Sequence, residues 1–138
     1  MKTVPTLTLE DAKRITAAAE AKADEIGQPM NVAVVDAGGN LLSHVRMDGA
    51  WVGSIKIAQD KAFTSRAFDI ATADLAEHSQ PGTQFYGIQQ SNGGRIMIFA
   101  GGRPIKNGDG AVVGAVGVSG GSGEQDDAVA EAGVAAAG

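Results

Sequence analysis

Ser119 lies in a stretch whose residue order matches a catalytic turn, GVSGG at residues 117–121. The G-x-S-x-G pattern is typical of the nucleophile elbow of α/β-hydrolases, in which a serine stands on a sharp turn between a strand and a helix. In those enzymes the histidine of the catalytic triad follows the serine, whereas both histidines of this chain, His44 and His78, precede it. The context therefore favours a structural role for Ser119 over a nucleophile.

The strand that leads to Ser119 has one face of small side chains. Alternation with period two places Val113, Ala115 and Gly117 on the same face as Ser119. A face this bare allows a helix, a partner chain or a ligand to lie directly on the backbone. Neither G-x-G-x-x-G nor G-x-x-x-x-G-K-[ST] occurs in the glycine-rich tract, and acidic residues follow it, which argues against a phosphate-binding loop.

A second set of polar residues alternates along the segment LLSHVRMD, residues 41–48. His44, Arg46 and Asp48 share one face of the predicted strand by period two. A histidine, a cation and a carboxylate in line could bind a ligand, or could supply a haem ligand, His44, and a propionate partner, Arg46. A solvated strand face with cross-strand charge pairs is the alternative interpretation.

Lys61 lies in a predicted helix on a face with small and apolar residues, among them Ala58 and Ser65. Such a lysine can extend along its apolar stem to water. It can instead lose its solvent and serve as a base or as an anchor for an anion. Both interpretations of Lys61 are retained.

The remaining candidates are isolated in the sequence. His78 is expected at a helix C-terminus, where the helix dipole favours a cation. The two histidines are far apart, no H-x-x-x-H spacing occurs and the chain has no cysteine, so neither a zinc or non-haem iron site nor a disulfide is expected. Asp36 precedes Gly-Gly-Asn and is expected to bond the backbone amides of that turn.

Hydrophobic periodicity and turn residues predict the elements that position these side chains. Capping boxes are expected at Thr8 with Asp11 and at Ser122 with Gln125. Arg103-Pro104 is expected to form a rigid exit from a strand. We expect a helix from Thr8 to about Gly27, strands over 30–37 and 41–48, a helix over 53–68, a short helix capped by Thr72 and running to Glu77, strands over 95–101 and 111–119 joined by a turn at 106–110, and a last helix that Ser122 caps.

This order of hairpins and helices predicts one α+β domain over residues 1–138, with an antiparallel sheet and helices packed on it. The chain has 43% hydrophobic and 20% charged residues, which is ordinary for a globular protein. Its net charge of −5, without a basic patch, argues against a nucleic-acid partner. The first residues lack a secretory pattern and no stretch reaches the length of a membrane span, so we expect a cytoplasmic protein with no membrane partner.

Several segments together resemble the GlcG/HbpS-type family, the haem-degrading domain, which is related to the C-terminal part of PduO-type corrinoid adenosyltransferases. The motifs are V-D-x-x-G-N, R-M-D-G-A, D-K-A-x-T, G-G-x-P and G-V-S-G-G, in this order. The resemblance covers about Thr8 to Gly133. It implies a profilin-like α/β sandwich with an antiparallel sheet of about five strands. It also implies a homo-oligomer of high order, such as an octamer, and it makes G-V-S-G-G a strand-to-helix corner.

The resemblance further implies that the protein binds haem or a related tetrapyrrole as an accessory, sensor or degradation factor. The matching positions are Asp36, Arg46, Asp48, Lys61, Thr64, Gly102, Pro104 and Ser119. With His44 added, the expected cofactor contacts are His44, Arg46, Asp48, Lys61, Thr64 and Ser119. The iron ligand would be His44, His78 or a methionine.

The sequence is also compatible with two alternatives to haem binding. In the first, the chain is a small-molecule catabolic enzyme without a redox cofactor, with Lys61 or His44 as a base in a pocket near Lys61 and Arg46 at a subunit interface. In the second, it is an oligomeric structural protein with no chemistry of its own.

Overall fold

The computed structural model describes all residues, 1–138, and its elements follow the predicted order of helix, hairpin, helices, hairpin and helix. The long helices begin and end close to the predicted bounds. The elements are α1 (Leu9–Ile26), β1 (Asn31–Asp36), β2 (Leu41–Arg46), α2 (Ser54–Phe68), α3 (Thr72–His78), the short 3₁₀ helices η1 (Ile88–Gln90) and η2 (Asn92–Gly94), β3 (Gly102–Lys106), β4 (Val112–Ser119) and α4 (Gly123–Ala135).

The strands form one antiparallel sheet in the order β2-β1-β4-β3. Two hairpins, β1–β2 and β3–β4, are joined where β1 pairs with β4, for example Val32 with Val118. The predicted α+β class is confirmed, with four strands in place of about five. The two outer strands, β2 and β3, are the edges of the sheet.

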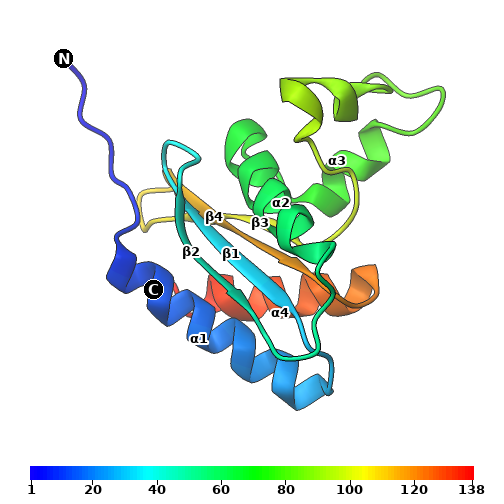
Figure 1. Cartoon of the computed structure of the whole chain (residues 1–138). Helices are drawn as coiled ribbons and strands as arrows, with labels where there is room; N and C mark the ends of the chain where they lie inside the picture. The colour runs from blue at the N-terminus through cyan, green and yellow to red at the C-terminus, as the bar shows by residue number, and fades with distance from the viewer.

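Helices cover both faces of the sheet (Figure 1). Helices α1 and α4 lie side by side on one face and enclose the larger core, which includes Ile15, Val32 and Val116. Helix α2 covers the other face and packs alanines against Ala33 and Ala115. The burial of these side chains is the main favourable contribution to folding.

The bare face of β4 is covered by α2. A Cβ atom added to Gly117 would collide with the carbonyl oxygen of Ala58 and would lie 2.5 Å from the amide nitrogen of Ala62. The helix backbone therefore rests directly on the strand backbone. Of the three occupants that the sequence allowed for this face, the structure has a helix.

Both predicted capping boxes are confirmed, at Thr8 with Asp11 and at Ser122 with Gln125. The prediction that Thr72 caps the short helix is wrong. Ala71 is the N-cap of α3, and the Thr72 hydroxyl accepts a hydrogen bond of 2.8 Å from the backbone N–H of Gly102. The Thr72 side chain is buried, and this hydrogen bond links α3 to β3. It also gives the buried N–H of Gly102 a partner, and an unpaired buried N–H would be costly.

The predicted strand over 95–101 is also wrong, since β3 begins only at Gly102. The Thr64 hydroxyl of α2 accepts from the N–H of Met97 (3.0 Å), and its one proton lies between the carbonyls of Asp60 (2.7 Å) and Arg95 (3.2 Å). These bonds hold the apolar segment against a helix instead of a strand. Gly101 then has φ 123°, a conformation that interrupts regular strand pairing.

The segment Arg103-Pro104 lies inside β3 and does not form the exit that the sequence suggested. Pro104 pairs with Ala115 of β4, and β3 is an edge strand, so the missing N–H of proline costs no sheet hydrogen bond on the open side. The turn predicted at 106–110 is confirmed between β3 and β4.

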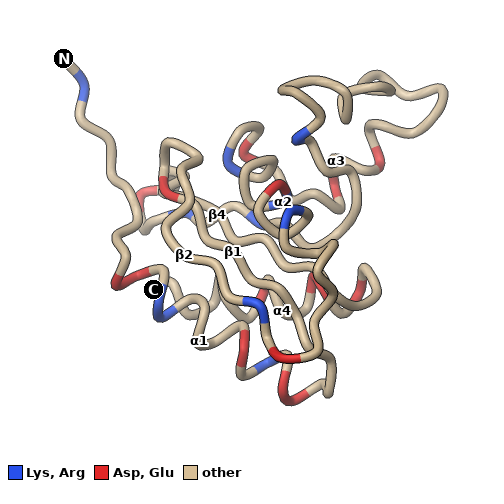
Figure 2. Tube along the Cα trace, viewed as in Figure 1, with Lys and Arg blue, Asp and Glu red and all other residues tan.

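Residues 79–95 extend beyond the sheet, at the upper right of Figure 1, and most of their side chains are exposed. In Figure 2, acidic and basic positions are interspersed along the chain. No helix combines the length and the apolar character needed to cross a membrane.

Candidate functional site

Two of the sequence-predicted site residues, Lys61 and His44, lie in two separate polar clusters. We define the lysine cluster as Lys61, Asp126 and the Val118 carbonyl, and the histidine cluster as His44, Asn31 and Gln59. Hydrogen bonds join the members of each cluster. The two clusters differ in how far solvent can reach them.

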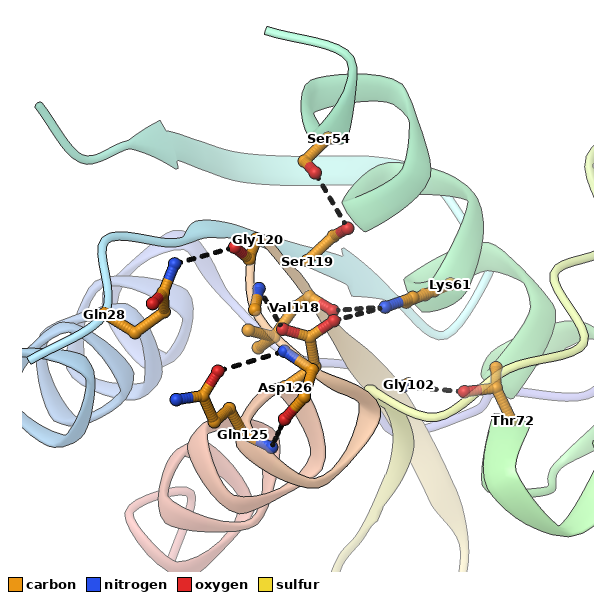
Figure 3. A network of polar contacts seen from close by, with 12 residues as sticks. Gln28, Ser54, Lys61, Thr72, Gly102, Val118, Ser119, Gly120, Gln125 and Asp126 are labelled. Carbon is orange, nitrogen blue, oxygen red and sulfur yellow. Dashed lines mark hydrogen bonds and ion pairs between the residues drawn. The ribbon is translucent and has the colours of Figure 1, made fainter. Parts of the chain in front are cut away.

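The lysine cluster is enclosed (Figure 3). The Lys61 side chain is 0% exposed, and its Nζ donates to the Val118 carbonyl at 2.8 Å and to Asp126 Oδ2 at 3.0 Å. The Phe99 ring lies 5.0 Å from the same nitrogen, within the range of a cation–π contact. Asp126 Oδ1 accepts from the backbone N–H of Gly121. Lys61 therefore does not extend to water, and its ammonium joins α2, β4 and α4.

Burial acts on both charges of the lysine cluster. Loss of solvent lowers the pKa of Lys61, and the Asp126 carboxylate opposes this shift. Loss of solvent likewise raises the pKa of Asp126, and the Lys61 ammonium opposes it. Gly101 leaves room for the pair, since a Cβ atom there would lie 2.8 Å from Lys61 Nζ.

Ser119 lies at the end of β4 and is nearly fully buried. Its hydroxyl donates to the Ser54 hydroxyl at 3.1 Å, as Figure 3 shows. This bond links β4 to the first turn of α2. Asp36 bonds its turn as predicted: its Oδ1 accepts from the N–H groups of Gly38 (2.9 Å) and Asn40 (3.0 Å).

The histidine cluster lies between β2 and α2. His44 is half-buried, and its Nε2 is 3.1 Å from Oδ1 of Asn31, a fully buried residue of β1. On the other side of the ring, Nε2 of the half-buried Gln59 is 3.4 Å from His44 Nδ1. Ser43, the preceding residue, contacts Thr16 of α1 instead, so the predicted alternation of strand faces is confirmed at this point.

Burial lowers the pKa of His44, which favours the neutral form of the imidazole. The segment that enters α2 adjoins this cluster, because Asn31 Nδ2 donates to the Trp51 carbonyl at 2.9 Å. Trp51 and Val52 expose 63% and 70% of their surface. A neutral imidazole thus lies beside a segment with exposed apolar side chains.

Arg46 lies two residues after His44 at the end of β2, and Asp48 follows outside the strand. An Arg46 Nη1 is 3.4 Å from the Ala50 carbonyl, a long hydrogen bond. Both residues also line a hollow of about 600 Å³ whose other charged residues are acidic, Glu20 and Asp24. Lys61 is not among the residues that line this hollow.

His78 ends α3 and is exposed. Its ring meets Phe85 edge to face, with 6.5 Å between the centroids. Phe85 and Tyr86 are themselves exposed. The His78 side chain makes no hydrogen bond to another side chain or to the backbone.

Sequence reasoning missed three residues that build the clusters. Asp126 was considered only as one of the acidic residues that follow the glycine-rich tract, and Asn31 and Gln59 were not singled out. Strand pairing carries the missing signal for Asn31: it pairs with Arg46, so it lies on the same face as His44. That register could not be deduced before the hairpin was known to have an irregularity at Val34/Val35.

Comparison with known proteins identifies relatives across nearly the whole chain. Residues 7–135 match the family model described as haem-degrading protein HbpS-like. The chain is 47% identical over 128 residues to an uncharacterized 15.0 kDa protein in the dhaT-dhaS intergenic region of Citrobacter freundii, which covers 93% of this chain and 89% of that protein. It is 36% identical to the corrinoid adenosyltransferase PduO of Salmonella typhimurium over 94% of this chain, but it spans only 38% of that enzyme.

Solved structures share the fold. The Klebsiella pneumoniae protein ORFY is 41% identical, with a TM-score of 0.96 over 99% of this chain and 94% of that chain. A structure named PduOC:heme complex is 36% identical, with a TM-score of 0.90 over 95% of this chain and 94% of that chain.

Proposed function

The chain belongs to the HbpS-like family of haem-degrading proteins, and we propose that it binds haem through His44, on the surface between β2 and the start of α2. The structure named PduOC:heme complex, from a relative with 36% identity, supports haem as the ligand. The histidine cluster supports His44 as the residue that holds it.

The observation that carries this choice is the bond between His44 Nε2 and buried Asn31. A histidine that binds a metal almost always donates its other ring N–H to a fixed partner, which orients the ring. His44 has such a partner and is neutral, as a ligand must be. His78 is exposed and lacks one.

The surroundings of His44 fit a haem in charge and polarity. Trp51 and Val52 offer exposed apolar surface to a porphyrin. Arg46 has an exposed guanidinium with one long bond, and it can hold a propionate. A bound haem would supply a redox-active iron, and His44 would be the side chain that holds it.

We also propose that the chain forms a homo-oligomer. The aromatic residues Trp51, Phe85, Tyr86 and Phe99 are all exposed in the single chain. Exposed aromatic side chains in this number are typical of surfaces that bind a partner. Light scattering of the purified protein is expected to give a multiple of 13.9 kDa, and a monomer at micromolar concentration would contradict this proposal.

Haem titration of the cofactor-free protein, followed by its Soret absorbance, tests the haem proposal. We expect saturable binding that His44→Ala abolishes and His78→Ala leaves unchanged. Loss of binding only in His78→Ala would move the site to α3. A weak, unsaturable signal that neither substitution alters would contradict haem binding altogether.

A further inference from the structure

We propose that Asn31 is a positioning residue that makes Nδ1 the nitrogen through which His44 binds haem iron, and that Gln59 covers this nitrogen until haem displaces it. This inference rests on the proposed function, and it specifies how the same site is built. It follows from a chain of three hydrogen bonds that begins at a backbone carbonyl.

The first bond fixes the orientation of the Asn31 amide. Asn31 Nδ2 lies 2.9 Å from the carbonyl oxygen of Trp51. A carbonyl only accepts, so the amide must present its NH₂ group to Trp51. Its Oδ1 then necessarily faces His44. Asn31 is fully buried in β1, which holds it between its two neighbours in the sheet.

The second bond fixes the tautomer of His44. Because Asn31 Oδ1 can only accept, the ring nitrogen 3.1 Å away, Nε2, must carry the proton. A neutral imidazole has one proton, so the lone pair is on Nδ1. Gln59 fits this assignment, since its Nε2–H can donate to that lone pair.

The third bond is the weakest of the chain. The distance of 3.4 Å between Gln59 Nε2 and His44 Nδ1 exceeds that of a good N–H donor bond. Gln59 is only half-buried on α2, so its side chain can turn away without opening the fold. Nε2, in contrast, points at a fully buried residue, where iron has no access. The accessible ligand atom of His44 is therefore Nδ1.

The tautomer can be measured without haem by ¹⁵N NMR of the cofactor-free protein. We expect His44 to show a protonated Nε2 and an unprotonated Nδ1, and Asn31→Ala to give a mixture of both tautomers. A protonated Nδ1 in the wild-type protein would overturn the inference.

Haem titration of two variants then shows whether iron binds Nδ1 or Nε2 of His44, because the two cases predict opposite changes in haem affinity. If iron binds Nδ1, Gln59→Ala removes a competitor and raises haem affinity by about two- to tenfold. Asn31→Ala removes the orienting partner and lowers affinity by about tenfold or more. If iron binds Nε2, the signs reverse: Asn31→Ala frees the ligand atom and Gln59→Ala has no favourable effect. That reversed result would overturn the inference.

Two controls keep the outcome interpretable. Gln90→Ala removes a glutamine whose side chain makes no hydrogen bond, and it is expected to leave haem affinity unchanged. Gln59→Ala does not alter the sheet, so it gives an answer even if Asn31→Ala fails to fold. If the wild-type protein shows no His44-dependent haem binding, the proposed function and the Nδ1–iron assignment both fail, while the NMR result still decides whether Asn31 sets the tautomer.

Discussion

The lysine and histidine clusters both consist of hydrogen-bonded polar groups, but they differ in whether a polar atom is left available to a ligand. Both join a residue on or facing α2 to the sheet through side-chain hydrogen bonds. In the lysine cluster a carbonyl, a carboxylate and an aromatic face surround the ammonium, and all of them are its partners. In the histidine cluster one nitrogen has a buried partner and the other only a long bond to a half-buried side chain.

This difference shows that burial alone does not identify a binding site. Lys61 is the more deeply buried group, and two hydrogen bonds and the Phe99 ring face its ammonium, which makes it a structural link. His44 is less buried, but it has a lone pair that a ligand can take at little cost. A better indicator of a binding site is a side chain that one hydrogen bond orients and that has a second polar atom with only a long hydrogen bond.

The largest expected effect comes from breaking the lysine cluster. Lys61→Met leaves the Asp126 carboxylate buried without a counter-charge, and we expect a loss of about 3–5 kcal/mol in the free energy of unfolding. Denaturant unfolding measures it. The double variant Lys61→Met/Asp126→Asn removes both charges and should be more stable than Lys61→Met alone. Equal instability of the two variants would show that the ion pair is not the cause.

Substitution of one glycine near each cluster by alanine compares how tightly the two regions are packed. Gly101→Ala places a Cβ atom against Val118 and Lys61 at φ 123°, and we expect a loss of about 2 kcal/mol or more. Gly53→Ala, beside the exposed Trp51 and Val52, meets nothing within 4 Å at φ −61° and should stabilise by about 0.4–1 kcal/mol. Thermal unfolding of both variants checks the contrast, and similar losses would contradict it.

The pH dependence of stability reports on the neutral state of His44. Its folded pKa is lowered by burial, so the unfolded chain takes up a proton near pH 6.5 while the folded protein does not. The stabilising contribution is present above about pH 6.5 and is lost as the pH falls through the folded pKa. The melting temperature of the wild-type protein should fall more than that of His44→Gln between about pH 7.5 and about pH 5.5. Parallel curves would show that His44 is not held neutral.

The smallest effect on stability is expected at the exposed side of the histidine cluster. Trp51→Ser changes a side chain that is 63% exposed, so the free energy of unfolding should change by less than about 0.5 kcal/mol. Haem affinity should nevertheless fall, because apolar contact surface is lost. Tyr86→Ser, an exposed aromatic beside the His78 region, is the matched control and should leave haem affinity unchanged. A loss of affinity in Tyr86→Ser alone would place haem at α3.

Local patterns in the sequence predicted much of the fold. Side chains that bond their own neighbours could be recognised, such as Thr8 with Asp11 and Asp36 with its turn. The predictions failed where a distant partner decides the structure. Thr64 holds the apolar segment 95–97 away from the sheet, and Thr72 bonds Gly102 rather than its own helix.

The candidate site was predictable only in part for the same reason. Residue type and spacing identified His44, Arg46 and Lys61. The side-chain partners of His44, however, lie 13 or more residues away in the chain, and the ion-pair partner of Lys61 lies 65 residues away. Asn31 looks like an ordinary polar residue at the start of a strand. Its role becomes visible only when the register of β1 and β2 places it beside His44.

The close contact between Gly117 and α2 determines the position of the Gln59 backbone. The helix and strand backbones are in contact at Ala58 and Ala62, so no flexible side chain lies between them that could adjust their spacing. Gln59 follows Ala58 directly, so its starting point is set by two backbones in direct contact. Amide hydrogens at this contact should exchange with solvent only when the whole domain opens, whereas release of Gln59 from His44 needs only a rotation of the Gln59 side chain.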